Sequence, residues 1–163
     1  MNYFIISDTH FWHWFMIDIG IRKKWFEKKI LSQLSHLPQD TILIHLWDIC
    51  IGWDTYRHDI ISKIPLRKIL VKGNHDKKTY SWYLEHWWDF VCDTFTLDLF
   101  NKKIIFSHEP IIDHWCDINI HWHMHVKFDR DVGRENKWRC YSAEIESYVP
   151  KKLTHEFLHS ITI

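Results

Sequence analysis

Five short clusters of side chains that can bind divalent cations occur along the chain, each after a short apolar run rich in β-branched residues. The clusters contain carboxylates, imidazoles and an amide, which are common ligands of divalent metal ions. Ligands of open α/β sheets collect at the carboxyl ends of strands, so clusters that follow separate strands can converge on one site. The clusters are Asp8-Thr9-His10, Trp47-Asp48, Gly73-Asn74-His75-Asp76, Ser107-His108-Glu109-Pro110 and His121-Trp122-His123-Met124-His125.

These residue types suit a hydrolytic centre with two metal ions. Two cations about 3.5–4 Å apart repel each other, so an anion such as a carboxylate must bridge them. Imidazoles and a carbonyl oxygen fill the other positions and leave room for water and substrate. A hydroxide held by the metals can then attack phosphorus while the cations neutralise charge on the phosphoryl oxygens. The alternative is structural, because Asp8, Asp48 and Asn74 also suit helix caps and turns.

The order and types of these residues resemble the calcineurin-like metallophosphoesterase superfamily. The resemblance runs from Asp8 to beyond His125 and covers nearly the whole chain. Ser-Asp-Thr-His-Phe-x-His at residues 7–13 and Ser-His-Glu-Pro at residues 107–110 look most like the small prokaryotic or phage-type phosphoesterases. The fold that the resemblance implies is mixed α/β (α+β), a sandwich of two packed β-sheets flanked by helices.

The resemblance also implies a role for each matching position. The metal ligands would be Asp8, His10 and His125 on the first ion, Asp48 as the bridge, and Asn74, His108 and His123 on the second ion. His75 would contact the scissile phosphate and help to protonate the leaving oxygen, and Asp76 would orient the His75 ring. Manganese, iron, zinc and nickel all suit such ligands. His13 and His121 lie close to these motifs in the sequence. Each could contact the substrate, support a metal ligand, or be merely structural.

Tryptophan stands at positions 12, 47 and 122, where the family pattern has glycine. Glycine permits a positive φ and close approach of the backbone to a ligand. The chain holds 4 glycines and 11 tryptophans, whereas average usage would give about 11 glycines at this length. We hypothesise that Trp12, Trp47 and Trp122 are encoded by UGA, read as glycine in the source organism. Trp87 or Trp88 is a fourth case, and Trp53, which follows Gly52, is a further candidate. The alternative is that the tryptophans are genuine and the site is degenerate.

Apolar patterning places the clusters at strand ends and predicts both strands and helices. Strands are predicted at residues 2–7, 41–46, 67–72, 90–91, 95–99, 103–107, 118–121 and 139–148. Helical spacing covers residues 14–34, 54–63, 77–86 and 154–159, and Asn101-Lys102 indicates a hairpin turn. Strands that alternate with helices and then run on as strands indicate a mixed sheet system with helices outside. The length of 163 residues fits a single domain over residues 1–163.

The composition argues against several classes of protein. The 21 basic and 21 acidic side chains cancel, unlike those of a general nucleic-acid or membrane-surface binder. No apolar run approaches the roughly 18 residues of a membrane span. Met1 leads directly into a predicted strand, so no signal peptide is expected. The four cysteines form no CxxC pair, which favours free thiols in a reduced, cytoplasmic protein.

The sequence therefore predicts a phosphoesterase that uses two divalent metal ions to hydrolyse a phosphomonoester or phosphodiester. Two alternatives stay open at this point. One is a non-catalytic scaffold of the same fold that binds protein partners. The other is a nuclease, with nucleic acid as the substrate of the same centre. Its candidate phosphate contacts are Lys23, Lys24, Lys28, Lys29, Arg130 and Arg134, for which a solvated face is the simpler interpretation.

Overall fold

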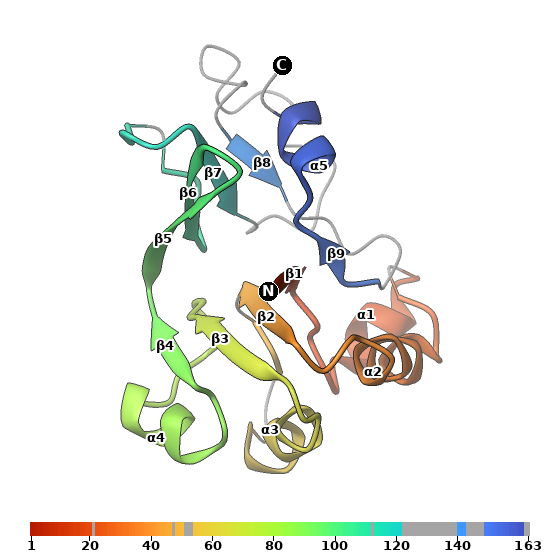
Figure 1. The fold of residues 1–163 in the computed structure, drawn as a ribbon. Helices are drawn as coiled ribbons and strands as arrows, with labels where there is room; N and C mark the ends of the chain where they lie inside the picture. Colours follow the sequence, from red (N-terminus) through yellow and green to blue (C-terminus); the bar gives the residue numbers. More distant parts are fainter. Residues whose placement is uncertain are drawn as a thin grey trace.

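Two β-sheets and five helices make up the part of the chain that the computed structural model describes (Figure 1). That part comprises residues 1–20, 22–46, 48–50, 54–111, 113–121, 140–142 and 149–161. The predicted fold class is confirmed, because the structure is mixed α/β with two sheets flanked by helices.

The first sheet has the strand order β4-β3-β2-β1-β9. Its strands are β1 (Asn2–Ser7), β2 (Thr41–Leu46), β3 (Arg67–Val71), β4 (Phe90–Cys92) and β9 (Lys151–Lys152). β1 to β4 are mutually parallel, and β9 pairs antiparallel with β1. Because β2 is central and covered on both faces, its sequence TILIHL is almost continuously buried and does not alternate.

The second sheet has the order β5-β6-β7-β8. Its strands are β5 (Thr94–Leu99), β6 (Lys102–Ser107), β7 (Ile118–His121) and β8 (Cys140–Ser142). β5 and β6 form an antiparallel hairpin, while β6, β7 and β8 run parallel. Exposed and half-buried residues alternate along β5, as expected of an edge strand with one face toward solvent.

Two apolar layers hold these elements together. One lies between the first sheet and α2 (Phe26–Ser35), α3 (Asp54–Ser62) and α4 (Tyr80–Glu85), which cover one face of that sheet (Figure 1). The other lies between the two sheets, where Ile44 and Val71 belong to the same cluster as Phe106 and Ile120. α5 (His155–Ser160), the blue helix in Figure 1, contributes Leu158 to this second layer.

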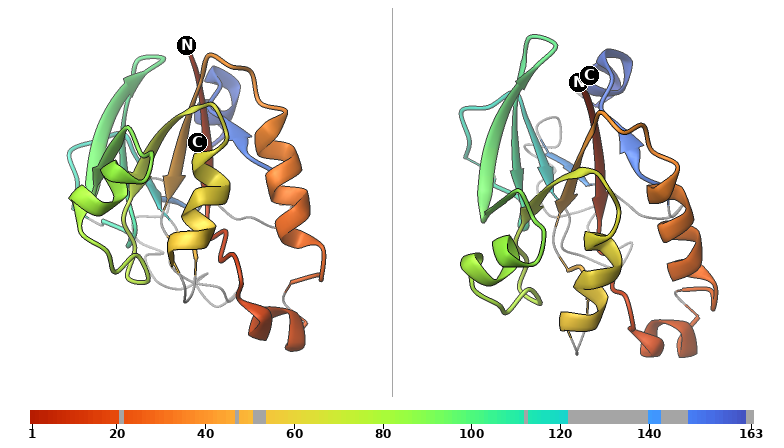
Figure 2. Two further views of the ribbon diagram at one scale, coloured as in Figure 1. Left: turned by 90° about the horizontal axis from the view of Figure 1, so that it is seen from below. Right: turned by 60° about the horizontal axis from the view of Figure 1, so that its bottom comes forward.

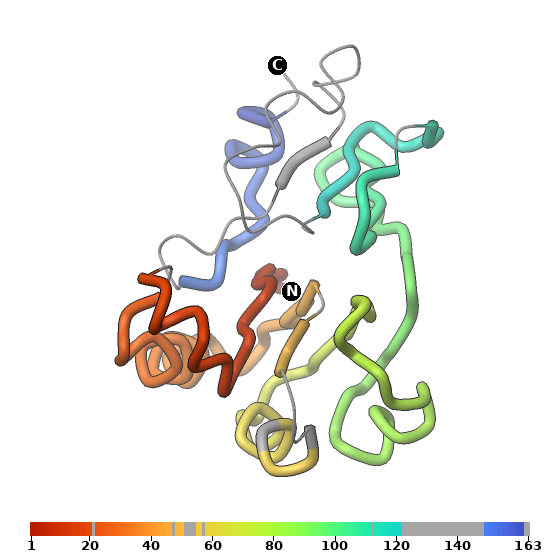
Figure 3. The backbone as a smooth tube through the Cα atoms, turned by 180° about the vertical axis from the view of Figure 1, so that it is seen from behind, coloured from red at the N-terminus to blue at the C-terminus, as the bar shows by residue number. Residues whose placement is uncertain are grey.

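The predicted helical segment over residues 14–34 is wrong as a single helix. The chain forms α1 (Trp14–Asp18) and α2 with a break between them, seen at the red end of the tube in Figure 3. Gly20 ends α1 with a φ of 78°, a conformation that costs glycine little and that cannot continue a right-handed helix. The helical spacing does not mark one continuous buried face, because Phe15 and Ile19 are exposed whereas Phe26, Ile30 and Leu34 are buried.

The hairpin between β5 and β6 is confirmed, with its turn one residue earlier than predicted. Phe100 and Asn101 are its central residues, and both have positive φ, 51° and 59°. Two successive positive φ values fit the turn geometry that matches the twist of paired strands.

β9 was not predicted, because two exposed lysines carry no strand pattern. The charged segment at residues 126–138 lies outside the described residues. In the described part of the chain, no helix has the length and apolar character needed to cross a membrane.

His58 of α3 is a buried titratable group in the helix layer. Its ring centroid lies 5.2 Å from that of Trp82 and 5.1 Å from that of Tyr83. The Trp88 indole N–H donates to His58 Nδ1 at 3.5 Å, so this nitrogen is the unprotonated acceptor. Burial, aided by the charges of His86 and Lys78, lowers the pKa of His58 to about 3.

We expect His58 to make the protein acid-sensitive. The unfolded chain binds a proton near the ordinary pKa of 6.5, whereas the folded chain does so only near about 3. The free energy of unfolding therefore falls as the pH drops through this window, by up to about 1.4 kcal/mol per pH unit. Denaturant melts across the window should show a shallower slope of unfolding free energy against pH for His58→Phe than for the parent, while His155→Phe, at an exposed position of α5, keeps the parent slope. An unchanged slope in His58→Phe would contradict the assignment.

Candidate metal centre

The loops that follow β1, β2, β3 and β6 carry the predicted ligands, as the sequence indicates. β1, β2 and β3 are parallel, so the loops after them leave the sheet at one edge, and Figure 2 shows this for the loops after β1 and β2. Asp8 and His10 follow β1 directly, and Asp48 follows β2. The parallel pairing extends past the strand ends, because the amides of His10 and Phe11 donate to the carbonyls of Asp48 and Ile49, both at 3.0 Å.

Asp8, His10 and Asp48 form a buried cluster that could hold a metal ion. One ligand atom from each residue lies within 4.8 Å of those of the other two. His10 Nε2 lies 3.2 Å from Asp8 Oδ1 and 3.8 Å from Asp48 Oδ2. The three residues are only 1%, 1% and 3% exposed. Two carboxylates buried against one imidazole are a donor set that suits a divalent cation, because uncompensated buried charge is costly.

The three candidate ligands share a left-handed backbone conformation. Asp8, His10 and Asp48 have φ values of 44°, 43° and 47°. This region is unfavourable for residues with a Cβ, and such strain persists only where surrounding contacts enforce it. The clustering of strained residues at the predicted ligands supports the identification of this edge as a functional site.

Buried polar contacts hold these strained loops in place. The Arg22 guanidinium, 8% exposed, donates from Nη2 to the carbonyl of Asp8 at 2.8 Å. The Thr9 hydroxyl donates to the Ile49 carbonyl at 2.9 Å and lies 3.0 Å from His45 Nε2. Since the hydroxyl proton is used on Ile49, His45 must carry its proton on Nε2 and donate to Thr9. The sequence interpretation missed Arg22 and His45; a histidine inside the apolar strand TILIHL was the available signal.

A second group of predicted residues joins the cluster through Asp48. The His75 amide donates to Asp48 Oδ1 at 3.1 Å, and the His75 ring centroid lies 5.9 Å from that of His10. Asn74 Oδ1 accepts a hydrogen bond from His108 Nε2 at 3.1 Å. Asn74 and His75 are exposed, so this side of the site faces solvent. The structure thus brings together residues from the loops after β1, β2, β3 and β6.

His13 also lies at this site. Its ring centroid is 5.4 Å from that of His10, and burial, followed by the charges of His75 and Arg22, lowers the pKa of His13. His121, at the end of β7, is buried. Trp47, Trp122, His123 and His125 lie outside the described residues, so the ligand roles of the last two stay predictions.

Asp76 connects the loop after β3 to the loop after β2. Its carboxylate accepts hydrogen bonds from the amides of Gly73 at 2.9 Å, Asp48 at 3.0 Å and Ile49 at 3.4 Å. Burial and the Asp48 charge raise the pKa of Asp76 to about 7, against the effect of the three amides. Within the described residues, the carboxylate makes no hydrogen bond to the His75 ring. The orienting role for His75 therefore stays a prediction, and the observed contacts fix the backbone around Asp48 instead.

Removing the charge of Asp48 should abolish tight metal binding. Asp48→Asn keeps the size of the side chain but loses one of two buried carboxylates, so we expect the affinity for Mn²⁺ to fall by roughly 100-fold or more. Isothermal titration calorimetry measures this directly. Asp59→Asn, a matched change at an exposed position of α3, should bind as the parent does. Equal affinities in all three proteins would rule out a metal at this cluster.

Asp76→Asn should loosen the Asp48 loop without removing a ligand. An amide offers one acceptor oxygen and turns N–H groups toward backbone donors, so we expect a loss of about 1–3 kcal/mol in the free energy of unfolding. The amides of Asp48, Ile49 and Gly73 should exchange faster with solvent, and the affinity for Mn²⁺ should fall about 10- to 100-fold. NMR exchange rates test the loop separately from metal binding. Unchanged exchange at these three amides would disprove the connecting role.

No protein-family model matches the chain, and no curated protein matches it. Among solved structures, the protein of unknown function AQ665 from Aquifex aeolicus is similar over 99% of both chains, with 28% sequence identity and a TM-score of 0.79. A novel archaeal phosphodiesterase is a more distant match, with 17% identity over 77% of this chain and 74% of its own, and a TM-score of 0.49. The first match supports the fold along the full chain and leaves the function to be argued from the site.

Proposed function

We propose that this chain is a metal-dependent phosphoesterase that hydrolyses a phosphomonoester or phosphodiester. The observation that carries the proposal is the buried cluster of Asp8, His10 and Asp48, whose ligand atoms lie within 4.8 Å of one another at the carboxyl ends of parallel strands. The order of the motifs and their resemblance to the calcineurin-like metallophosphoesterases support the same chemistry.

The residues divide into two groups around Asp48. Asp8, His10 and Asp48 would hold one cation, while Asn74 and His108, together with His123, would hold a second. When bound, the cations would neutralise charge on the phosphoryl oxygens and make a water molecule more acidic. Asp48 would be the residue common to both groups, because its Oδ2 lies 3.8 Å from His10 Nε2 and its Oδ1 accepts a hydrogen bond from the His75 amide.

His75 is the residue best suited to assist the leaving group. Its backbone is held by Asp48, while its ring is exposed and lies next to the ring of His10. A general acid must reach the leaving oxygen from the solvent-facing side of the site, and a positioned histidine typically contributes 10²- to 10⁴-fold to the rate. His13 would act beside it as a neutral hydrogen-bonding group, since its lowered pKa favours the uncharged ring.

The rest of the site would limit movement of these groups. Arg22 fixes the Asp8 carbonyl, and Asp76 fixes the amides of Asp48 and Ile49. Ligands held in advance need little reorganisation when charge develops on the phosphate, which is the main source of electrostatic catalysis. The Arg22 and Asp76 contacts are therefore part of the proposed machinery, although neither side chain would touch the substrate.

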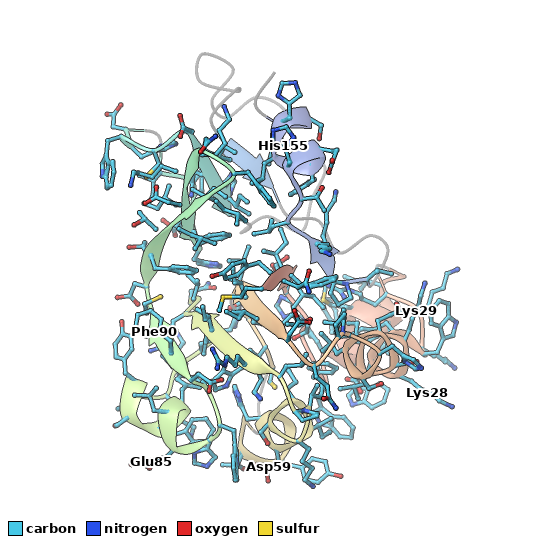
Figure 4. The ribbon with its side chains drawn as sticks, viewed as in Figure 1. Lys28, Lys29, Asp59, Glu85, Phe90 and His155 are labelled. Carbon is cyan, nitrogen blue, oxygen red and sulfur yellow. The ribbon has the colours of Figure 1, made fainter. Side chains whose placement is uncertain are left out.

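The basic residues of α2 give no separate reason to propose a nuclease. Lys28 and Lys29 project outward from α2 (Figure 4). The Lys29 ammonium lies 5.4 Å from the ring centroid of Trp25, a contact that a solvated helix face explains. The proposal therefore covers phosphate esters in general, with nucleic acid as one substrate to be compared.

The test is Mn²⁺-dependent hydrolysis of an aryl phosphodiester and an aryl phosphomonoester. We expect turnover that stops on chelation of the metal and resumes when Mn²⁺ is restored. His75→Ala should lower kcat by about 10²- to 10⁴-fold while Mn²⁺ still binds. His155→Ala, at an exposed histidine whose ring neighbours are Phe100 and His159, should retain the parent rate. A folded, metal-loaded protein that hydrolyses neither substrate would instead favour the non-catalytic scaffold.

A further inference from the structure

Helix α4 ends in a turn whose left-handed residue is Trp87. The helix stops at Glu85, His86 is its C-cap, and Trp87 follows with a φ of 76°. The Trp88 amide donates to the Tyr83 carbonyl at 3.2 Å, a bond that closes the turn around Trp87. This pattern is the Schellman motif, and the left-handed position within it is occupied preferentially by glycine, because a Cβ there meets the following carbonyl.

The end of helix α1 shows which residue this chain has at the equivalent position of another helix. α1 ends at Asp18, Ile19 is its C-cap, and the next residue is Gly20 with a φ of 78°. The Gly20 amide donates to the Ile17 carbonyl at 3.0 Å, as expected of the same kind of helix end. Trp87 therefore has the place and the backbone conformation that glycine has in α1.

Trp87 and Trp88 have opposite environments. The side chain of Trp87 is 67% exposed, whereas that of Trp88 is 3% exposed and belongs to the core cluster. The Trp88 indole donates to His58, and its ring centroid lies 5.9 Å from that of His45. The Trp88 side chain therefore fills space in the core, whereas the Trp87 side chain contributes nothing to core packing.

Trp12 repeats the features of Trp87 beside the candidate metal centre. Its φ is 71° and its side chain is 43% exposed. Its amide donates to the Glu27 carboxylate, and its ring packs on Trp14, with centroids 4.9 Å apart. Two of the seven described non-glycine residues with positive φ are thus tryptophans, although bulky residues are outliers in this region.

We infer that the natural protein has glycine at positions 12 and 87 and tryptophan at position 88. Misreading of UGA codons as tryptophan would explain both positions together with the count of 4 glycines against 11 tryptophans. At position 12, glycine would relax the loop two residues beyond His10 and remove a large ring from the edge of the site. This inference rests on backbone geometry and stands whether or not the chain is a phosphoesterase.

The gene and the protein from its source organism give the direct test. We expect UGA at codons 12 and 87 and UGG at codon 88. Mass spectrometry of the peptide that spans residues 80–90, isolated from the organism, should show glycine at 87 and tryptophan at 88. UGG at codon 87, or tryptophan at residue 87 in the natural peptide, would overturn the inference.

A folding experiment tests the backbone argument without the organism. Trp87→Gly should raise the ratio of folded to unfolded protein roughly tenfold in denaturant melts, because the left-handed strain is removed. Trp87→Ala is the matched control: it also removes the ring but keeps a Cβ, and should gain clearly less. Trp115→Gly, at a 73% exposed tryptophan outside the left-handed region, should give no gain. Equal midpoints for Trp87→Gly and Trp87→Ala would contradict the inference.

Discussion

The burial of two carboxylates against one imidazole is the constraint on which the site depends. Asp8 and Asp48 are almost fully buried within reach of His10, at the point where β1 and β2 end. Two like charges in a region of low dielectric repel each other strongly unless a cation or hydrogen-bond donors compensate them. The loops around the cluster are consequently rich in polar contacts, and they adopt backbone conformations that residues with side chains otherwise avoid.

These polar contacts link segments that are distant in the sequence. Arg22, after α1, reaches the Asp8 carbonyl, and Asp76, after β3, reaches the amides of Asp48 and Ile49. His45, inside β2, donates through Thr9 to the same loop. Arg22 and Asp76 bind main-chain atoms directly, and His45 does so through the Thr9 hydroxyl, so the backbone of these loops is held before any substrate arrives. Such fixation suits a site that must hold charge in a defined arrangement.

The central strands were predictable because their sequences have one stable arrangement. β1 and β2 were predicted with their observed bounds, since a continuous apolar run such as TILIHL must be covered on both faces. The break between α1 and α2 was not predicted, because the apolar spacing continues across it, although Phe15 and Ile19 are exposed in the structure. β9 could not be predicted either, because a two-residue strand of exposed lysines exists only through its pairing with β1.

The sequence by itself determined the chemistry that is available. It showed which carboxylates, imidazoles and amides follow which predicted strands, and it indicated that Asp8, His10, Asp48 and Asn74 would meet at strand ends. Residue types, and the order of the predicted strands along the chain, can be read directly from the sequence. The tertiary structure decided how the groups are held. In the folded chain, three backbone amides donate to the Asp76 carboxylate, and Arg22 donates to the Asp8 carbonyl. Trp87 is exposed with a positive φ, whereas its neighbour Trp88 is buried. These outcomes depend on distances across the fold and on φ angles, which no pattern of residue types specifies.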